Sequence, residues 1–409
     1  MRGDIRLARA GTRDRAEGAA PVIRPTVARV DLEAVRSNFR TISAFLGPLP
    51  GSDRDRPSDS RHQVKSRSNP GIIAVVKANA YGHGAAEVGR ALEQAGAAML
   101  ACADIEEGIV LRRAGVRVPI LVFGALGISD LDGVFQHYLT PTISTPSAAR
   151  ALQASAAAHG TVLKCHLKID TGMNRLGFRH DNVARTLPEV AASRNLSIEA
   201  AYTHFATADE PESAAFDEQR ERFEAVCASL ERLGIPTRPR HAANSAALLR
   251  DERVWYDFVR PGLLLYGIVP PPLAVTLPLR PALSLHSRIV HVKGLRPGEG
   301  TGYGLRPVSN RPSTIAVVPA GYADGLDRRL AGRGYMLVRG RRAPIVGSVC
   351  MDMTMIDVTG TDVAPGDEVV IIGQQGDESL GVREIAASIG TIPYELLCRV
   401  GSRIERVYE

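Results

Sequence analysis

A lysine at the end of an apolar run is the first residue whose position suggests chemistry. Residues 71–84 read GIIAVVKANAYGHG, and the β-branched run at 72–76 predicts a strand buried on both faces, as in a parallel sheet. Lys77 follows this run and precedes a loop that carries Tyr81. Carboxyl ends of buried strands are where α/β barrels place reactive groups, and apolar surroundings can lower a lysine pKa enough for imine formation. The alternative is a lysine that simply leaves the strand for water.

A second lysine lies in the segment 166–178, which reads HLKIDTGMNRLGF. The preceding strand alternates, so Lys164, His166 and Lys168 are expected to share one face. One face of this strand must point into a barrel interior, where a lysine is costly unless it is paired or modified. Arg175 follows Lys168 by seven positions. The alternative is an exposed strand lysine and a solvated loop arginine.

Three further polar residues lie at the ends of predicted strands or shortly after them. His204 ends a strand in YTHFATAD, where a satisfied core histidine is the alternative. Ser245, in HAANSAA, is expected to cap the helix of residues 246–249, and a helix N-terminus suits a phosphate, although a simple cap explains this serine equally well. Arg260 begins the segment RPGLLLYG, which also contains Gly262 and Leu263.

Glycine-flanked motifs in the last third of the chain contain four more candidates. They are Tyr303 in GYG, Tyr322 in GYADG, and Met351 and Asp352 in CMDM. Glycine flanks permit close approach of the backbone to a ligand. The alternatives are a turn tyrosine and a buried methionine.

The surrounding pattern predicts two domains and an α/β fold. Residues 1–25 are expected to be a disordered tail, and residues 47–70, rich in Pro, Ser, Asp and Arg, a loop insertion. From residue 71 strands and helices alternate eight times, which predicts a (β/α)8 TIM-like barrel over residues 26–270. Residues 271–409 contain period-2 strands and turns, which predict a β-rich C-terminal domain. The barrel strands are expected at 72–76, 97–103, 119–123, 139–143, 162–169, 198–204, 240–242 and 257–260.

Composition excludes several classes of protein. The chain has 409 residues, a formal net charge of +6 and five cysteines without CxxC spacing, which favours a cytoplasmic protein with reduced thiols. No apolar run approaches the ~18 residues of a membrane span, and the N-terminus has no apolar core of a secretory signal. The sequence contains no patch of basic and aromatic residues that would predict nucleic-acid binding. It also contains no cluster of residues that would predict a metal site.

The motif VVKANAYGHG resembles the cofactor-lysine motif of the alanine racemases, which are fold-type III pyridoxal-phosphate enzymes. The resemblance implies that Lys77 forms the Schiff base with pyridoxal phosphate and that Tyr81 contacts the phosphate. The segment at 166–178 resembles the family's HLKxDTGMxRxG motif. There the lysine, here Lys168, is often N-carboxylated and orients the arginine, here Arg175, which meets the cofactor's phenolic oxygen and the substrate carboxylate. The family's histidine against the pyridine ring corresponds to His204.

The same resemblance assigns the remaining contacts. Phosphate is held by Ser245 and by the backbone of Gly262 and Leu263. Arg260 faces the pyridine nitrogen; because an arginine can only donate, that nitrogen stays unprotonated and simple proton exchange is favoured over transamination. The supporting positions are Lys168, Asn244, Tyr322 and Asp352.

Two residues of the second domain complete the implied site from a partner subunit. Tyr303 is the second catalytic base, and Met351 offers its backbone N–H to the substrate carboxylate, so a homodimer with shared active sites is expected. The family's late phosphate-binding tyrosine is replaced by Ser402 in CRVGSRIERVY, which leaves that contact open.

The resemblance covers residues 26–409 and implies an alanine racemase activity. L-alanine and D-alanine would be interconverted by two-base proton transfer, with Lys77 serving the D-enantiomer and Tyr303 the L-enantiomer, to supply D-alanine for peptidoglycan. Two alternatives stay open. One is a racemase of broader specificity, or a decarboxylase, with the same fold, and the other is a non-catalytic pyridoxal-phosphate carrier.

Overall fold

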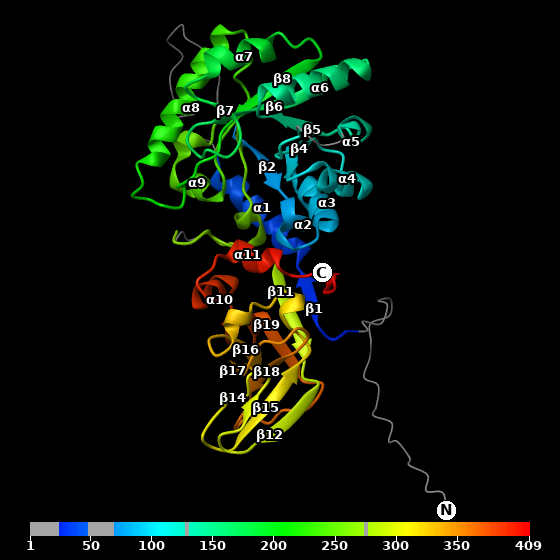
Figure 1. Ribbon diagram of the computed structural model, residues 1–409, viewed down its shortest axis with the longest axis vertical. Coiled ribbons are helices and arrows are strands. Elements are labelled where there is room, and N and C mark those ends of the chain that lie inside the picture. The colour runs from blue at the N-terminus through cyan, green and yellow to red at the C-terminus, as the bar shows by residue number, and fades with distance from the viewer. Residues whose placement is uncertain (1–23, 48–68, 127–130, 274–276) are drawn as a thin grey trace, which may run out of the picture.

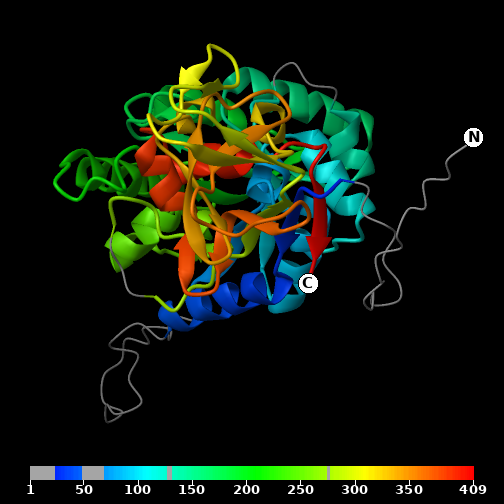
Figure 2. The same cartoon turned by 90° about the horizontal axis from the view of Figure 1, so that it is seen from below.

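The computed structural model describes residues 24–47, 69–126, 131–273 and 277–409. The expected tail of residues 1–25 and the expected insertion at 47–70 lie almost entirely outside these ranges. The described chain forms a helix-covered barrel and a smaller strand-rich part, stacked along the long axis of the molecule (Figure 1). Seen from below, the strand-rich part lies across one end of the barrel (Figure 2).

Eight parallel strands form the closed barrel that the alternating pattern predicts. Each strand pairs with the next along the chain, and pairing of the eighth with the first closes the ring. Because the closed ring has no free strand edge, every barrel strand is hydrogen-bonded on both sides. The strands are β2 (Gly71–Val75), β3 (Met99–Cys102), β4 (Ile120–Val122), β5 (Thr140–Ile143), β6 (Leu163–Asp170), β8 (Leu196–Tyr202), β9 (Arg240–His241) and β10 (Phe258–Val259).

Helices surround the barrel and bury one face each. In α8 (Ala215–Arg232) the side chains of Phe216, Phe223, Val226 and Leu230 are buried at helical spacing, as in an amphipathic helix. A two-residue strand, β7 (Phe178–Arg179), pairs with the end of β6. The other helical elements of this part are α1 (Leu32–Phe45), α2 (Lys77–Tyr81), α3 (Ala85–Ala95), α4 (Ile105–Arg113), α5 (Asp132–Gln136), α6 (Pro146–Ala158), α7 (Val183–Ala191), α9 (Ser245–Arg250), η1 (Glu252–Val254) and η2 (Leu263–Tyr266).

The strand-rich part contains one large, mostly antiparallel sheet, in the order β12-β15-β18-β17-β16-β19-β11-β1-β21, with β20 beside β19 and a separate β13–β14 hairpin. Two helices, α10 (Val382–Ser388) and α11 (Pro393–Cys398), lie at its junction with the barrel (Figure 1). Its strands are β11 (Leu283–Arg288), β12 (His291–Leu295), β13 (Gly300–Thr301), β14 (Arg306–Pro307), β15 (Ser313–Val318), β16 (Tyr335–Val338), β17 (Arg341–Val346), β18 (Thr354–Asp357), β19 (Glu368–Gln375), β20 (Glu378–Leu380) and β21 (Glu405–Tyr408), and its short 3-10 turns are η3 (Tyr322–Asp324) and η4 (Arg328–Leu330).

The first strand, β1 (Val27–Val30), does not belong to the barrel, so the predicted barrel boundary at residue 26 is wrong. β1 pairs antiparallel with β11 and parallel with β21, inside the strand-rich sheet. An alternating pattern identifies a half-buried strand but carries no information about its partner. From β1 in the strand-rich sheet the chain therefore enters the barrel part through α1, whose buried Asn38 donates to the carbonyl oxygens of Leu265 and Arg280.

In the described residues, no helix is both long and apolar enough to cross a membrane.

Candidate active site

A cavity of about 320 Å³ opens at the carboxyl ends of the barrel strands. Every site residue predicted in the barrel lines it, although the motifs are spread over nearly two hundred positions of the chain. Parallel strands in a barrel bring their carboxyl ends to one rim, and this geometry gathers the side chains. The predicted lining residues are Lys77, Tyr81, Lys168, Arg175, His204, Asn244, Ser245, Arg260, Gly262 and Leu263.

Lys77 follows β2 and begins a left-handed turn. Residues 78–81 have φ between 52° and 54°, a conformation that costs non-glycine residues roughly 1–2 kcal/mol each. Side chains hold the turn in place, since Glu107 accepts from the Ala78 amide at 2.6 Å and Asn79 accepts from the Ala85 amide at 2.8 Å. Burial, and next the positive charge of Arg175, lower the pKa of Lys77. Its amine is thereby made easier to deprotonate.

Tyr81, Ser245 and Gly262 form one wall of the cavity. The Ser245 hydroxyl accepts from the Gly262 amide at 2.9 Å. Ser245 does not cap α9, contrary to the sequence-based prediction. The N-cap is Asn244, whose side chain accepts from the Ala247 amide at 2.9 Å. Asparagine and serine are both good N-caps, and a one-residue shift of the helix start leaves the serine hydroxyl free to turn toward the cavity wall.

Arg260 is buried and fixes the protonation of its histidine neighbours. It donates to His241 Nδ1 at 2.8 Å, so the hydrogen of His241 is on Nε2 and is donated to His166 Nδ1 at 3.0 Å. Burial, and next the charge of Arg260, lower the pKa values of His166, to about 4, and of His241. Arg260 Nη2 also lies 3.3 Å from His204 Nδ1, which must accept. These histidines are therefore neutral, and Arg260 remains the cation of the group.

Lys168 projects from β6 into the same cavity. Its amine lies 4.8 Å from the centre of the Tyr202 ring, and it is largely buried, whereas Lys164 on the same strand is exposed and pairs with Glu199. Burial, followed by the charges of Arg260 and Arg175, holds the pKa of Lys168 well below its usual value. Asp170 raises the pKa, but less strongly than these three causes lower it, so the environment favours the neutral amine.

The four site residues predicted in the second domain do not line this cavity in the described chain. Tyr303, in the turn between β13 and β14, is 79% exposed, and Met351 is 52% exposed. They share a region of surface with Tyr322. The Tyr322 amide donates to Cys350 O at 2.9 Å, and Ser348 donates to Tyr303 O at 2.7 Å. Asp352, beside Met351, accepts from Arg403 at 2.6 Å. None of these four predicted residues is among the lining residues of the barrel cavity in the described chain.

Comparison with known proteins accounts for both domains. The family model for the alanine racemase N-terminal domain matches residues 60–270, and that for the alanine racemase C-terminal domain matches residues 282–408. This chain belongs to the alanine racemase family. The alanine racemase of Halothermothrix orenii is 41% identical over 390 residues, covering 95% of this chain and 98% of the relative.

Solved structures of the alanine racemase family have the same fold. The alanine racemase from Bacillus anthracis with bound L-Ala-P has a TM-score of 0.84 at 36% identity, covering 95% of this chain and 96% of that one. The alanine racemase from Streptomyces lavendulae has a TM-score of 0.86 at 33% identity, covering 96% and 98% of the two chains. A third, from Bartonella henselae, is described with covalently bound pyridoxal phosphate; it is 27% identical, with a TM-score of 0.80, and the match covers 94% of this chain and 99% of that one. As a member of this family the chain is a pyridoxal-phosphate-dependent isomerase.

The cavity fits the cofactor of the alanine racemases. Among the described residues, four basic side chains line it, Lys77, Lys168, Arg175 and Arg260, and none of these lining residues is an aspartate or a glutamate. Four basic groups that converge without a carboxylate favour an anionic ligand, and the phosphate group of pyridoxal phosphate carries the negative charge. The volume also lies within the ordinary range for small-molecule sites.

Two aromatic residues of the racemase site were missed by the sequence analysis. Tyr394 on α11 lines the cavity, and its ring centroid lies 6.0 Å from that of Tyr81, whereas Ser402 is exposed. A tyrosine late in the chain therefore lines the cavity, eight positions before Ser402. Tyr202 also lines the cavity and stacks on His241, with the two ring centroids 4.6 Å apart. The only sequence signal for Tyr394 was the Pro393 that starts its helix, and a helix start does not reveal which cavity the helix reaches.

Proposed function

We propose that the protein interconverts L-alanine and D-alanine, with pyridoxal phosphate held at the barrel mouth and each site completed by a second copy of the chain. The observation that carries this proposal is the cationic cavity free of carboxylates around Lys77. Outside this cavity, the β-rich part of the chain leaves Tyr303 and Met351 exposed, as residues that serve a neighbour's site would be. The functional division is into a barrel that binds the cofactor and a C-terminal domain, from about residue 271, that completes the partner's site.

The residues of the barrel have separable tasks. Bound pyridoxal phosphate acidifies the α-hydrogen of an attached amino acid by accepting its electron pair. Lys77 holds the cofactor and, when its amine is neutral, can take that hydrogen from one face; the lowered pKa favours this state. Tyr81, Ser245, Gly262 and Leu263 would hold the phosphate. Arg175 pairs with the substrate carboxylate, because a guanidinium forms two parallel hydrogen bonds with such a group.

Arg260 limits the chemistry to proton exchange. The guanidinium is donor-only and already donates to His241, Thr203 and Ala242, so it is held in one orientation. In the bound cofactor, a donor facing the pyridine nitrogen would keep that nitrogen unprotonated, and the ring would withdraw electrons less strongly. His204, which lies beside Arg260, would pack against the ring. This arrangement favours return of a proton to the carbon it left.

Tyr303 supplies the second base, for the opposite face of the substrate. One group cannot easily reach both faces of a carbon, so racemisation needs an acid and a base on opposite sides. The amide of Met351 receives the substrate carboxylate, while Tyr322 and Asp352 support their loops. Since these residues do not line the cavity of their own chain, the site is completed across a two-fold axis in a homodimer.

Supply of D-alanine for peptidoglycan in the cytoplasm is the cellular role that we propose. Unpaired cysteines at positions 102, 165, 227, 350 and 398 support a reducing compartment.

The deciding experiment is a racemisation assay of the purified holo-protein with a panel of amino acids. We expect interconversion of alanine enantiomers at a kcat/KM far above that for longer or charged side chains. Comparable rates with several amino acids would instead indicate a racemase of broader specificity, and release of carbon dioxide a decarboxylase. A protein with the cofactor's visible absorbance but no turnover would overturn the proposal in favour of a pyridoxal-phosphate carrier.

A further inference from the structure

Gln219, on α8, is a buried polar side chain that joins two loops of the barrel mouth. Its Nε2 donates to His204 O at 3.0 Å and to Thr171 Oγ1 at 3.2 Å, and its Oε1 accepts from the Ala206 amide at 2.8 Å. Thr171 begins the loop after β6, which carries Arg175, whereas His204 and Ala206 follow β8. Gln219 is 2% exposed. One side chain therefore fastens the Arg175 loop and the His204 segment to each other.

Neighbouring contacts extend this connection. The hydroxyls of Thr171 and Thr203 lie 2.7 Å apart, and both threonines are fully buried. Arg222, one turn after Gln219 on α8, donates to Thr171 O at 3.1 Å. Since a buried polar group that loses its partner is costly, the loops have little freedom to separate from α8.

The orientation of the Gln219 amide is fixed by its partners. The Ala206 N–H can only donate and His204 C=O can only accept, so the oxygen and nitrogen of the side chain cannot be exchanged. A glutamate carboxylate has the same shape but would place an acceptor against the His204 carbonyl. A methionine has a similar length and replaces neither contact.

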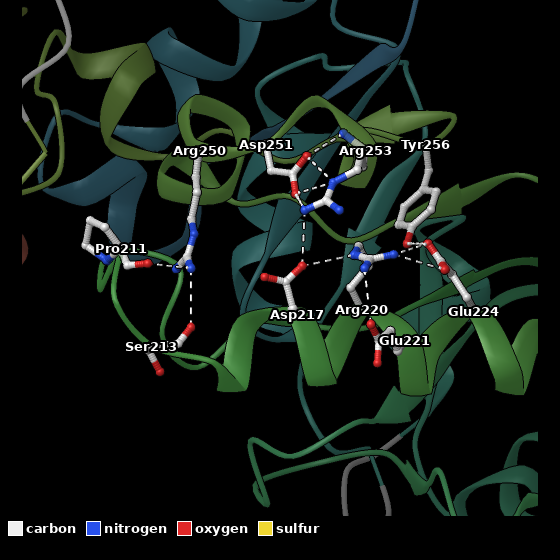
Figure 3. A network of polar contacts seen from close by, with 10 residues as sticks. All are labelled: Pro211, Ser213, Asp217, Arg220, Glu221, Glu224, Arg250, Asp251, Arg253 and Tyr256. Atoms are coloured by element: carbon white, nitrogen blue, oxygen red, sulfur yellow. Dashed lines mark hydrogen bonds and ion pairs between the residues drawn. The ribbon is translucent and has the colours of Figure 1, made fainter.

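Helix α8, which carries Gln219, is itself anchored by contacts with the segment that follows α9 (Figure 3). Arg253, after α9, donates to Asp217 at 3.1 Å, and the Tyr256 hydroxyl donates to Glu224 at 3.3 Å. Arg250 donates to Thr207 O at 2.9 Å and to Pro211 O at 3.0 Å, which holds the loop that continues from Ala206. The helix is therefore a fixed support, and a contact made from it sets the position of the loops.

We propose that Gln219 is a positioning residue, which sets the placement of His204 relative to Arg175. The proposal rests on the proposed function, because the placement of these residues matters only if His204 packs against the cofactor ring and Arg175 binds the substrate carboxylate. Arg260 donates to Thr203 O at 2.8 Å and so holds the start of the same segment. Gln219 fixes the end of this segment and connects it to the Arg175 loop. The turn of the Arg175 loop is closed by Asp170, which accepts from the Gly172 and Asn174 amides, each at 3.0 Å.

The test compares Gln219→Met with Gln153→Met in the holo-protein. Gln153, on α6, makes the same pair of contacts with Asn195, which precedes β8 at the end of the barrel opposite the cavity: Nε2 donates to Asn195 Oδ1 at 2.9 Å, and Oε1 accepts from the Asn195 amide at 2.8 Å. We expect Gln219→Met to lower kcat for alanine roughly ten- to hundredfold and to raise KM, because a small displacement of catalytic groups is enough for such losses. For Gln153→Met, kcat and KM should stay within about twofold of the wild-type values.

A second readout does not depend on turnover. On dilution, the holo-protein of Gln219→Met should lose its cofactor, followed by visible absorbance, several times faster than wild type or Gln153→Met. Gln219→Glu, which keeps the shape and the acceptor but loses the donor, should follow Gln219→Met in both readouts. The thermal unfolding midpoint of each Gln219 variant is compared with that of Gln153→Met to separate positioning from general destabilisation.

The proposal is overturned when kcat, KM and cofactor release of the folded Gln219 variants match those of wild type, or when Gln153→Met shows the same losses. Thr171→Val keeps shape but removes one hydroxyl of the network. Should the Gln219 variants fail to fold, Thr171→Val decides the matter by the same measurements, with smaller losses in the same direction. A wild-type protein that binds the cofactor but does not racemise would overturn the proposed function alone, and cofactor release would then decide the role of Gln219.

Discussion

The hydroxyl of Tyr81 lies so close to the backbone of Gly262 that a Cβ atom on Gly262 would be 2.5 Å from it. Tyr81 reaches this place from the left-handed turn after Lys77, and its ring packs at 5.1 Å from the centroid of Tyr266. Gly262 in turn donates its amide to Ser245. This wall of the cavity, which we propose holds the phosphate, thus depends on glycine at position 262, because any larger residue must displace the tyrosine hydroxyl.

Gly262→Ala should weaken cofactor binding by about tenfold or more, since the loss of one charge-assisted hydrogen bond costs roughly 1.5–3 kcal/mol. The measurement is the pyridoxal-phosphate dependence of visible absorbance in the reconstituted protein. Gly294→Ala is the matched control, because a Cβ at Gly294 meets no atom within 4 Å. Equal cofactor affinity in the two variants would contradict the assignment of this wall.

Lys77 should be the residue covalently linked to the cofactor. Borohydride reduction of the holo-protein, followed by peptide mass mapping, is expected to place the reduced cofactor on Lys77. Lys168 lines the same cavity and is the natural internal control. Label on Lys168 would refute the assignment.

Lys168 should be N-carboxylated. Carboxylation requires a neutral amine, and burial together with Arg260 and Arg175 lowers the pKa of Lys168. The product is an anion that can pair with Arg175 and hold it in place. Lys168→Ala should lose most activity, by about 10²-fold, and regain part of it with added acetate or formate. Intact-mass spectrometry showing an unmodified lysine in fully active enzyme would overturn this prediction.

Two defective variants should restore activity when they exchange subunits. Lys77→Ala lacks the cofactor lysine and Tyr303→Phe lacks the second base, so each homodimer should be nearly inactive. In a mixed dimer, one site combines an intact Lys77 with an intact Tyr303, and the other lacks both. Random exchange makes about half of the dimers mixed, so roughly a quarter of all sites should recover. Proven exchange with bound cofactor and no recovery would mean that Tyr303 does not act in the partner's site.

Stability should fall as the pH drops from about 6.5 toward 4. Burial lowers the pKa of both His83 and His166 to about 4, so between these values the unfolded chain binds more protons than the native one. Stability from these neutral histidines is therefore present above pH 6.5 and is lost as the pH falls through their folded pKa, by on the order of 3 kcal/mol each.

Urea unfolding of the holo-protein at several pH values measures this loss. His83→Asn keeps an amide donor for the carbonyl of Tyr81, which His83 Nδ1 contacts at 2.9 Å, but cannot titrate. Its stability should fall less steeply with decreasing pH than that of wild type. An unchanged slope would show that His83 does not contribute.

The sequence alone determined the barrel and the residues at its mouth. Lys77 and His204 each follow a predicted strand, and the carboxyl ends of parallel strands meet at one rim, so residues far apart in the chain could be assigned to one site. The local sequence pattern was sufficient to locate these residues, because the apolar run of each strand ends at the polar residue. The family resemblance supplied the proposed roles, and the barrel residues among them line one cavity.

Only the tertiary structure decided the features that depend on which elements meet. The partner of β1, the approach of Tyr394 to Tyr81, and the use of Asn244 rather than Ser245 as N-cap all lie outside local pattern. The left-handed turn at residues 78–81 is likewise unfavourable for its own sequence and exists because Glu107 and the Ala85 amide bind it from other elements. Alternation and helical spacing report how a segment is buried, whereas the neighbour that buries it is chosen by the packing of the whole chain.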